Sequence, residues 1–156
     1  MHTEQNVLSF HERLKLSGYE RDLGLFVVAH RDVATSDNKL KPYKDLVIDN
    51  HTKSKPRDLK DFVCETLKFR GDLESCQEIR EWEVPKFPVN GHDLKASGCP
   101  PGKFFAIVMK QLKEHWKDSN FQLDREGILE KLPEIVKNLD LSAAAHKNKK
   151  QRKNSK

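Results

Sequence analysis

Hydrophobic residues recur every three or four positions along almost the whole chain, and this spacing constrains the fold more than any other feature. It places them on one face of an α-helix, whereas a strand face needs alternation at every second position, which no segment sustains. The clearest stripe consists of Phe105, Val108, Met109, Leu112 and Trp116. The sequence therefore predicts an all-α fold, an irregular bundle of about six to seven helices.

The spacing also gives the approximate limits of these helices. Pro42 suits the first turn of a helix, Gly71 suits the end of one, and Asp124 suits an N-cap. Pro133 is expected to end or bend the last helix. We predict helices near 7–18, 20–31, 42–49, 59–71, 72–82, 103–117 and 124–133, and loops at 32–41, 50–56 and 84–102.

Composition and charge exclude several classes of protein. Of the 156 residues 34% are charged, and no apolar run approaches the 18 residues that a membrane span requires. Three widely spaced cysteines do not form a disulfide scaffold and are typical of reduced thiols in an intracellular protein. The N-terminus has neither a hydrophobic signal segment nor an arginine-rich face, so we expect no signal peptide or mitochondrial presequence there.

The net charge of +5 comes from the end of the chain. Residues 147–156 carry +6 without an acid, so the other 146 residues carry a net charge of −1. Residues 84–102 contain four prolines and three glycines, which break regular structure. We therefore expect one helical part at 1–83, a second helical part at 84–141, and a disordered basic tail at 142–156, whose residues suit either nuclear targeting and RNA affinity or simple solubility.

The segment Gly98-Cys99-Pro100-Pro101-Gly102-Lys103 opens the strongest predicted helix. Free backbone N–H groups and a partial positive charge at a helix start attract phosphate, glycines allow close approach, and Lys103 adds a cation. The segment lacks the GxxxxGK[ST] spacing of a P-loop. It is predicted either to bind phosphate or only to begin the helix.

A second stripe on this helix consists of Lys110, Lys113 and Lys117. It could contact a nucleic-acid backbone, or it could be the solvated face opposite the apolar stripe. Residues 86–123 carry a net charge of +3, whereas residues 57–83 carry −3. This polarity leaves both interpretations open, with any RNA-facing surface in the C-terminal half.

Other candidate sites have simpler explanations. His92-Asp93 is the residue pair of one class of metal phosphohydrolase, but the other histidines lack matching spacing and a turn or capping role is expected. Glu81 and Glu83 would point apart on a helix, which disfavours a two-metal site. Trp82 and Trp116 could stack on bases, although both continue apolar stripes and are expected to pack in the core.

Several stretches together resemble one family. They are residues 13–17 (RLKLS), 22–28 (DLGLFVV), 40–45 (LKPYKD), 87–94 (FPVNGHDL) and 105–117 (FAIVMKQLKEHWK). In this order they resemble the C-terminal body and tail of the eukaryotic, class II, mitochondrial-type CCA-adding tRNA nucleotidyltransferases. The likeness extends from about residue 8 to about residue 133, and the GHDL segment with the helix after it is its most specific part.

The resemblance implies that an all-α body (1–83) and tail (84–141) hold tRNA, while an N-terminal head and neck outside these residues carry the chemistry. That head would bind Mg²⁺ and the nucleotides CTP and ATP, so no residue here is expected to be catalytic or to bind a cofactor. The implied tRNA phosphate contacts are Gly98, Gly102, Lys103, Lys110, Lys113 and Lys117. The family implies a mitochondrial and nuclear or cytoplasmic location and no membrane partner.

Two other functions stay open from the sequence. One is a helical protein-interaction module with a basic nuclear-targeting tail, which would bind a protein partner with little dependence on salt. The other is a metal phosphohydrolase built on His92-Asp93, which would need a bound metal ion and further ligands.

Overall fold

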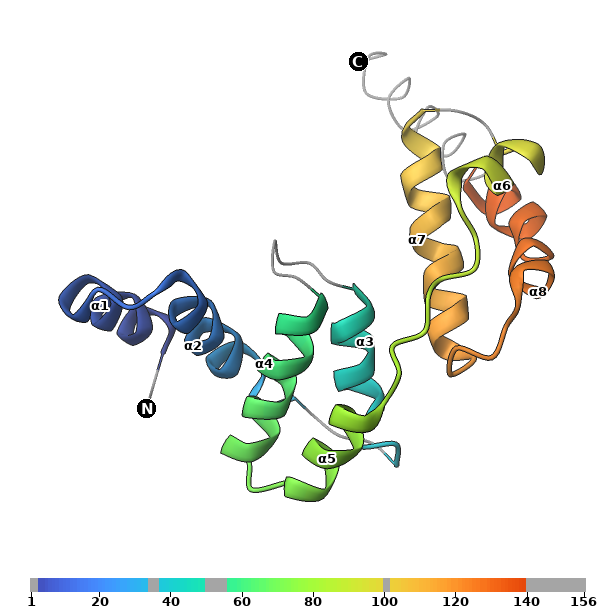
Figure 1. The fold of residues 1–156 in the computed structure, drawn as a ribbon. Coiled ribbons are helices and arrows are strands. Elements are labelled where there is room, and N and C mark those ends of the chain that lie inside the picture. Colours follow the sequence, from blue (N-terminus) through green and yellow to red (C-terminus); the bar gives the residue numbers. More distant parts are fainter. Residues whose placement is uncertain (1–2, 34–36, 50–55, 100–101, 140–156) are drawn as a thin grey trace, which may run out of the picture. The chain divides into compact units, whose positions relative to one another are not determined.

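The computed structural model describes residues 3–33, 37–49, 56–99 and 102–139. It consists of two compact units, Met1–Val84 and Pro85–Lys156 (Figure 1). Every regular element in the described ranges is helical, which confirms the all-α prediction. None of the described helices combines the length and the apolar character that a membrane crossing requires.

The helices match the predicted ranges closely, although there are more of them than expected. In the first unit they are α1 (Glu4–Leu14), α2 (Gly18–His30), α3 (Lys41–Asp49), α4 (Pro56–Phe69) and α5 (Leu73–Glu81). In the second unit they are α6 (Gly91–Ala96), α7 (Lys103–Asp118) and α8 (Arg125–Leu129), and residues 132–139 are also helical. The predicted loop at 50–56 lies outside the described residues except for Pro56, which begins α4, and the predicted disorder at 142–156 lies outside them as well.

The core of the first unit is built around α4. Phe62, which is almost fully buried, contacts the ring of Phe26 at 5.6 Å and that of Tyr19 at 5.2 Å between centroids. The other apolar face residues of α4 pack against α2, α3 and α5. The buried members of this core are Phe26, Leu40, Tyr43, Val47, Leu59, Phe62, Val63, Cys64, Leu67, Cys76 and Ile79.

Helix α1 differs from the other helices of the first unit because it has no buried residue. It packs on α2, where the absence of a side chain at Gly24 allows a close approach: a Cβ built there would lie 2.9 Å from Cγ1 of Val7. Gly18 begins α2, whereas the sequence placed it at the end of the first helix. The reason is Ser17, which caps α2 in a reciprocal pair of hydrogen bonds with Glu20.

The second unit packs α6 and α8 with α7 around a separate apolar core. Trp116, which is 2% exposed, contacts Phe87 at 5.3 Å and Phe121 at 5.0 Å between ring centroids, confirming that this tryptophan packs in the core. Trp82 is partly buried against the core of the first unit. The remaining buried apolar residues of the second unit are Val89, Leu94, Cys99, Val108, Leu112, Ile128, Leu132 and Ile135.

Two local predictions in this unit are wrong. The segment 84–102 contains a helix, α6, because Asn90 and Asp93 cap it reciprocally despite the surrounding prolines and glycines. Pro133 does not end α8, which finishes at Leu129. It lies in the first turn of the helical segment 132–139, where a missing N–H costs nothing.

Helix α7 ends in a sharp reversal. Asn120 and Phe121 both have positive φ values, 53° and 65°, and the backbone N–H of Phe121 donates to the carbonyl of Trp116 at 3.0 Å. The reversal returns the Phe121 ring to the indole of Trp116. The aromatic group formed by Phe87, Trp116 and Phe121 thus joins the segments before and after α7.

Candidate nucleic-acid interface

The start of α7 differs from the other helix starts whose N-caps the structure describes. Those of α1, α2, α5, α6 and α8 each have a side chain that accepts a backbone N–H bond, from Thr3, Ser17, Asp72, Asn90 and Asp124 respectively. The N-cap of α7 is Gly102, which makes no side-chain cap, and the first turn has no acidic residue. The positive end of this 16-residue helix is therefore not complemented by its own cap residue.

The glycines of this segment have backbone conformations that other residues rarely adopt. Gly98 has a φ of +80° and Gly102 a φ of +101°, and both are exposed with open space where a Cβ would lie. Between them Cys99 is buried, and its N–H donates to the carbonyl of Leu94 at 3.0 Å. The structure does not describe residues 100–101 or the side chain of Lys103. The phosphate contact predicted for Lys103 therefore stays a prediction.

The three lysines of the α7 stripe have different environments. Lys110 is exposed and lies about two turns, or about 10 Å, from the start of the helix. Lys113 is partly buried, and Lys117 is only 5% exposed with its Nζ 2.9 Å from Oε1 of Glu114. Lys117 thus does not lie on the solvated face that the periodicity suggested: its side chain is buried, and its ammonium group is paired with Glu114.

His92-Asp93 has the expected capping role. Asp93 is the third residue of α6, and its Oδ2 accepts the backbone N–H of Asn90 at 2.9 Å while Asn90 accepts that of Asp93 at 3.2 Å. Its other oxygen, Oδ1, lies 2.6 Å from Nη2 of Arg125 next to the N-cap of α8. Asp93 therefore ties α6 to α8, and His92 is exposed.

The surroundings of Asp93 predict a dependence of stability on pH. The hydrogen bond from Arg125, with that from the backbone of Asn90, holds the pKa of the Asp93 carboxyl below its usual range. A group with a lowered folded-state pKa stabilises the fold above its ordinary value near 4, and that stabilisation is lost as the pH falls through the lowered value. We expect Asp93→Asn to be less stable than the wild type at pH 7 and nearly as stable near pH 2.

This result can be checked by urea denaturation followed by circular dichroism at several pH values. Glu130→Gln, which removes an exposed carboxylate of the same unit, is the control and should change the pH profile less. Equal loss of stability by Asp93→Asn at pH 7 and pH 2 would contradict an ionic role for Asp93.

The described residues contain no group of three or more His, Cys, Asp or Glu side chains that could hold a metal ion. Asp93 already uses both oxygens within the protein, which makes it a poor ligand for the metal site of a phosphohydrolase. Burial raises the pKa of the Cys64 thiol to about 11, with the neighbouring Cys76 as the next cause, so this thiol is unsuited to act as a nucleophile.

Two contacts were missed by sequence reasoning. The Arg125–Asp93 pair joins residues 32 positions apart, and no local pattern could reveal it. Lys60 of α4 donates to the carbonyl oxygens of Arg80 at 2.8 Å and Trp82 at 2.6 Å, which satisfies the C-terminal end of α5. Lysine side chains often bond the last carbonyl groups of a helix. Lys60 lies 20 residues or more before its acceptors, so no local pattern in the sequence indicates this contact.

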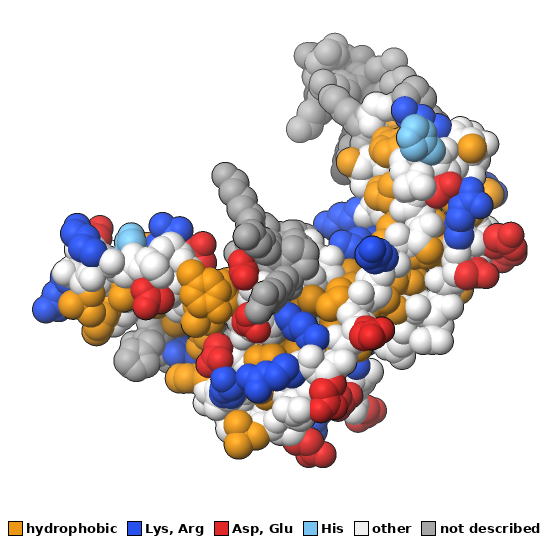
Figure 2. Space-filling model, viewed as in Figure 1, with side chains coloured by type: hydrophobic (Ala, Val, Ile, Leu, Met, Phe, Trp, Pro, Cys, Tyr) orange, Lys and Arg blue, Asp and Glu red, His pale blue; other side chains and the backbone are white. Residues whose placement is uncertain are grey.

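The surface charge is mixed on both units. Figure 2 shows basic and acidic side chains interspersed on the displayed face, without a large field of one sign. On the exposed side of α7, Lys110 lies with Glu114 and Asp118, so the most basic part of this helix is its first half. A contact with phosphates would therefore involve the start of α7 more than its end.

No protein-family model matches the chain. The chain is 38% identical over 130 residues to the mouse protein named CCA tRNA nucleotidyltransferase 1, mitochondrial, and 36% identical over 130 residues to the human protein of that name. The zebrafish protein is 35% identical over 133 residues. The two mammalian matches span 81% of this chain but only 29% of each relative, so the chain corresponds to less than a third of their length.

Proposed function

We propose that this chain, as a homologue of the mitochondrial CCA tRNA nucleotidyltransferases, is the tRNA-binding C-terminal region of such an enzyme. The observation that carries the proposal is the match over 81% of the chain, which confirms the family resemblance drawn from the sequence. The whole enzyme would add C, C and A to the 3′ ends of tRNA from CTP and ATP. In that enzyme this chain would bind the tRNA. It would act in mitochondria and, as the family implies, in the nucleus or cytoplasm.

The chain would bind the tRNA through phosphate contacts at the first half of α7. Backbone N–H groups at a helix start that lacks a side-chain cap can bind an anion, and the conformations of Gly98 and Gly102 leave open space beside it. Lys110 and Lys113 follow along the helix, whereas Lys117 is paired with Glu114 and contributes to the fold. Phosphate contacts position an RNA by its shape and carry no sequence information, which suits a protein that must accept many tRNAs.

The chemistry would belong to the part of the enzyme that this chain does not match. That part comprises more than two thirds of each relative, and it would bind Mg²⁺ and the nucleotides. The described residues of this chain do not assemble the carboxylate group that Mg²⁺ would need. We therefore expect the purified chain to add no nucleotide to a tRNA lacking CCA when it is supplied with CTP, ATP and Mg²⁺. Incorporation of labelled nucleotide by the chain alone would contradict this part of the proposal.

The RNA contact gives a prediction for Lys110→Glu. We expect this exposed substitution to weaken binding of a folded tRNA transcript several-fold at low salt. The slope of log affinity against log salt concentration should fall by about 1, because one phosphate contact is lost and its counterion is no longer released. Fluorescence anisotropy of labelled tRNA over a range of salt concentrations measures both quantities.

Lys39→Glu provides the matched control, because it makes the same change of charge at an exposed lysine of the first unit. It should leave the affinity for tRNA close to that of the wild type. Equal effects of the two substitutions, or no binding of folded tRNA at low ionic strength, would reject the RNA contact at α7. Binding of a protein partner that is insensitive to salt would then favour the interaction module considered from the sequence.

A further inference from the structure

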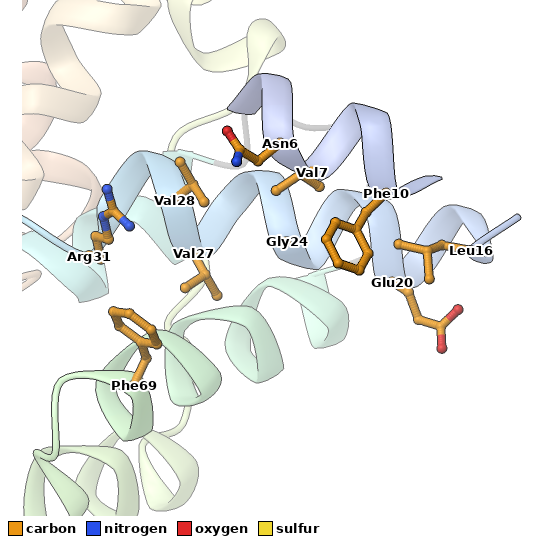
Figure 3. A pocket seen from close by; sticks show the side chains of 10 residues that line it. All are labelled: Asn6, Val7, Phe10, Leu16, Glu20, Gly24, Val27, Val28, Arg31 and Phe69. Atoms are coloured by element: carbon orange, nitrogen blue, oxygen red, sulfur yellow. The ribbon is translucent and has the colours of Figure 1, made fainter. Parts of the chain in front are cut away.

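The first unit has a groove that does not suit RNA. It lies between α1, α2 and the end of α4, has a volume of about 460 Å³, and its apolar lining includes Phe10 and Phe69 (Figure 3). Among the described residues that line it, Arg31 is the basic one, and its Nε lies 3.3 Å from a carboxylate oxygen of Asp32. RNA binding depends on basic groups, so this groove does not compete with the second unit for the phosphates of tRNA.

The tRNA contact proposed for the second unit combines backbone from two helices. Gly98 follows the end of α6, and the N–H of the next residue, Cys99, donates to the carbonyl of Leu94 in α6 at 3.0 Å. Gly102, in contrast, is the N-cap of α7. Both glycines are exposed, with open space beside them. Their relative position therefore depends on how α6 is held against α7.

The first half of α6 makes contacts to both α7 and α8. A Cβ built at Gly91 would lie 3.3 Å from Cζ of Phe105, which is in the first turn of α7. Two residues after Gly91, Oδ1 of Asp93 accepts a hydrogen bond of 2.6 Å from Nη2 of Arg125. This second contact ties α6 to α8, which itself packs on α7.

Arg125 is a well-fixed partner for this ion pair. It is the first residue of α8, and the residue before it, Asp124, caps the helix by accepting the N–H of Gly127 at 2.8 Å. Ile128 in the same helix is fully buried. The side chain of Asp93 is only 11% exposed, and a partly buried pair is screened less by salt than one at the surface. The pair thus links α6 to a helix that is itself anchored in the core.

We propose that Asp93 and Arg125 are positioning residues for tRNA, because their ion pair holds α6 in place and so sets the position of Gly98 beside the start of α7. Neither side chain needs to touch the RNA, since both act through the placement of the backbone. The inference deepens the proposed function and rests on it. It differs from a purely electrostatic view, in which removing an acidic side chain from an RNA-binding unit strengthens binding to the polyanion.

The test compares Asp93→Asn with Glu130→Gln in the full chain. Each substitution removes one negative charge from the second unit, but Asp93 bonds to Arg125, whereas Glu130 is exposed. We expect Asp93→Asn to weaken the binding of a folded tRNA transcript by about threefold or more, as residues of one hydrogen-bond network are coupled. Glu130→Gln should leave the affinity unchanged or slightly higher. Fluorescence anisotropy at low salt measures the affinities, at a temperature where circular dichroism shows each variant to be folded.

Substitutions of Arg125 separate positioning from direct contact. Arg125→Gln should weaken binding while leaving the cap of α6 intact, so it keeps the test valid if Asp93→Asn does not fold. Arg125→Lys keeps a cationic donor for Asp93 and should recover most of the affinity lost in Arg125→Gln. The double variant Asp93→Asn with Arg125→Gln should bind about as weakly as either single variant, because all three lose the same pair.

The opposite results would overturn the proposal. If the loss in the double variant equals the product of the two single losses, Arg125 contacts the RNA directly and is not a positioning residue. If Asp93→Asn binds tRNA as tightly as the wild type or more tightly, the electrostatic view is correct. Both results require a wild-type chain that binds tRNA, so they leave the proposed function standing. A wild-type chain that does not bind folded tRNA at low ionic strength would instead reject the proposed function, and this inference with it.

Discussion

Trp116→Ala is expected to lower the free energy of unfolding by about 3–5 kcal/mol. The indole is nearly completely buried on α7, between the rings of Phe87 and Phe121, so its removal leaves a cavity that these neighbours cannot fill without moving. The aromatic contacts add to the loss of buried area. Denaturation by urea, followed by circular dichroism at 222 nm, measures the change.

The control on the same helix is Ile107→Ala. Ile107 is 43% exposed, and its truncation should cost less than about 1 kcal/mol. If Trp116→Ala left stability unchanged and weakened the binding of tRNA, the tryptophan would be a base-stacking residue, and its assignment to the core would be wrong.

Phe62→Ala should cause a loss of similar size in the first unit, about 3–5 kcal/mol. Phe62 is almost fully buried on α4 and contacts the rings of both Tyr19 and Phe26, which lie on α2. Its removal should therefore weaken the packing of α2 on α4. Thermal unfolding together with amide hydrogen exchange of α2 would detect both effects.

Phe10→Ala is the corresponding control, since Phe10 is largely exposed in the groove of the first unit. It should cost less than about 1 kcal/mol in the isolated chain. Equal costs for Phe62→Ala and Phe10→Ala would show that the centre of this core is not where the structure places it.

Most of the helices could be predicted from sequence because their apolar residues repeat with the helical period. The long stripes of α4 and α7 are examples, and the cap at Asp124 was visible as a single residue before an apolar run. The short helix α6 could not be predicted by period. It is only six residues long, and the reciprocal cap between Asn90 and Asp93 stabilises it among prolines and glycines that favour turns.

The candidate interface could be predicted only in outline. Periodicity placed Lys117 in line with Lys110, but it could not tell that Lys117 is buried beside the core and paired with Glu114. The ion pair of Asp93 with Arg125 depends on how α6 and α8 pack, which no pattern along the chain contains. The groove on α1 was invisible for the same reason, because an apolar stripe indicates a buried face whether or not the chain itself supplies the cover.

Because of the reversal after α7, the fluorescence of Trp116 can report on the folding of the second unit. Each unit contains one tryptophan, and that of the second unit touches one aromatic ring from the segment preceding α7 and another from the segment following it. Its fluorescence should therefore respond when either flanking segment detaches, even if α7 itself stays helical. With Trp82→Phe silencing the other emitter, an emission spectrum would follow the integrity of this unit alone as RNA is added.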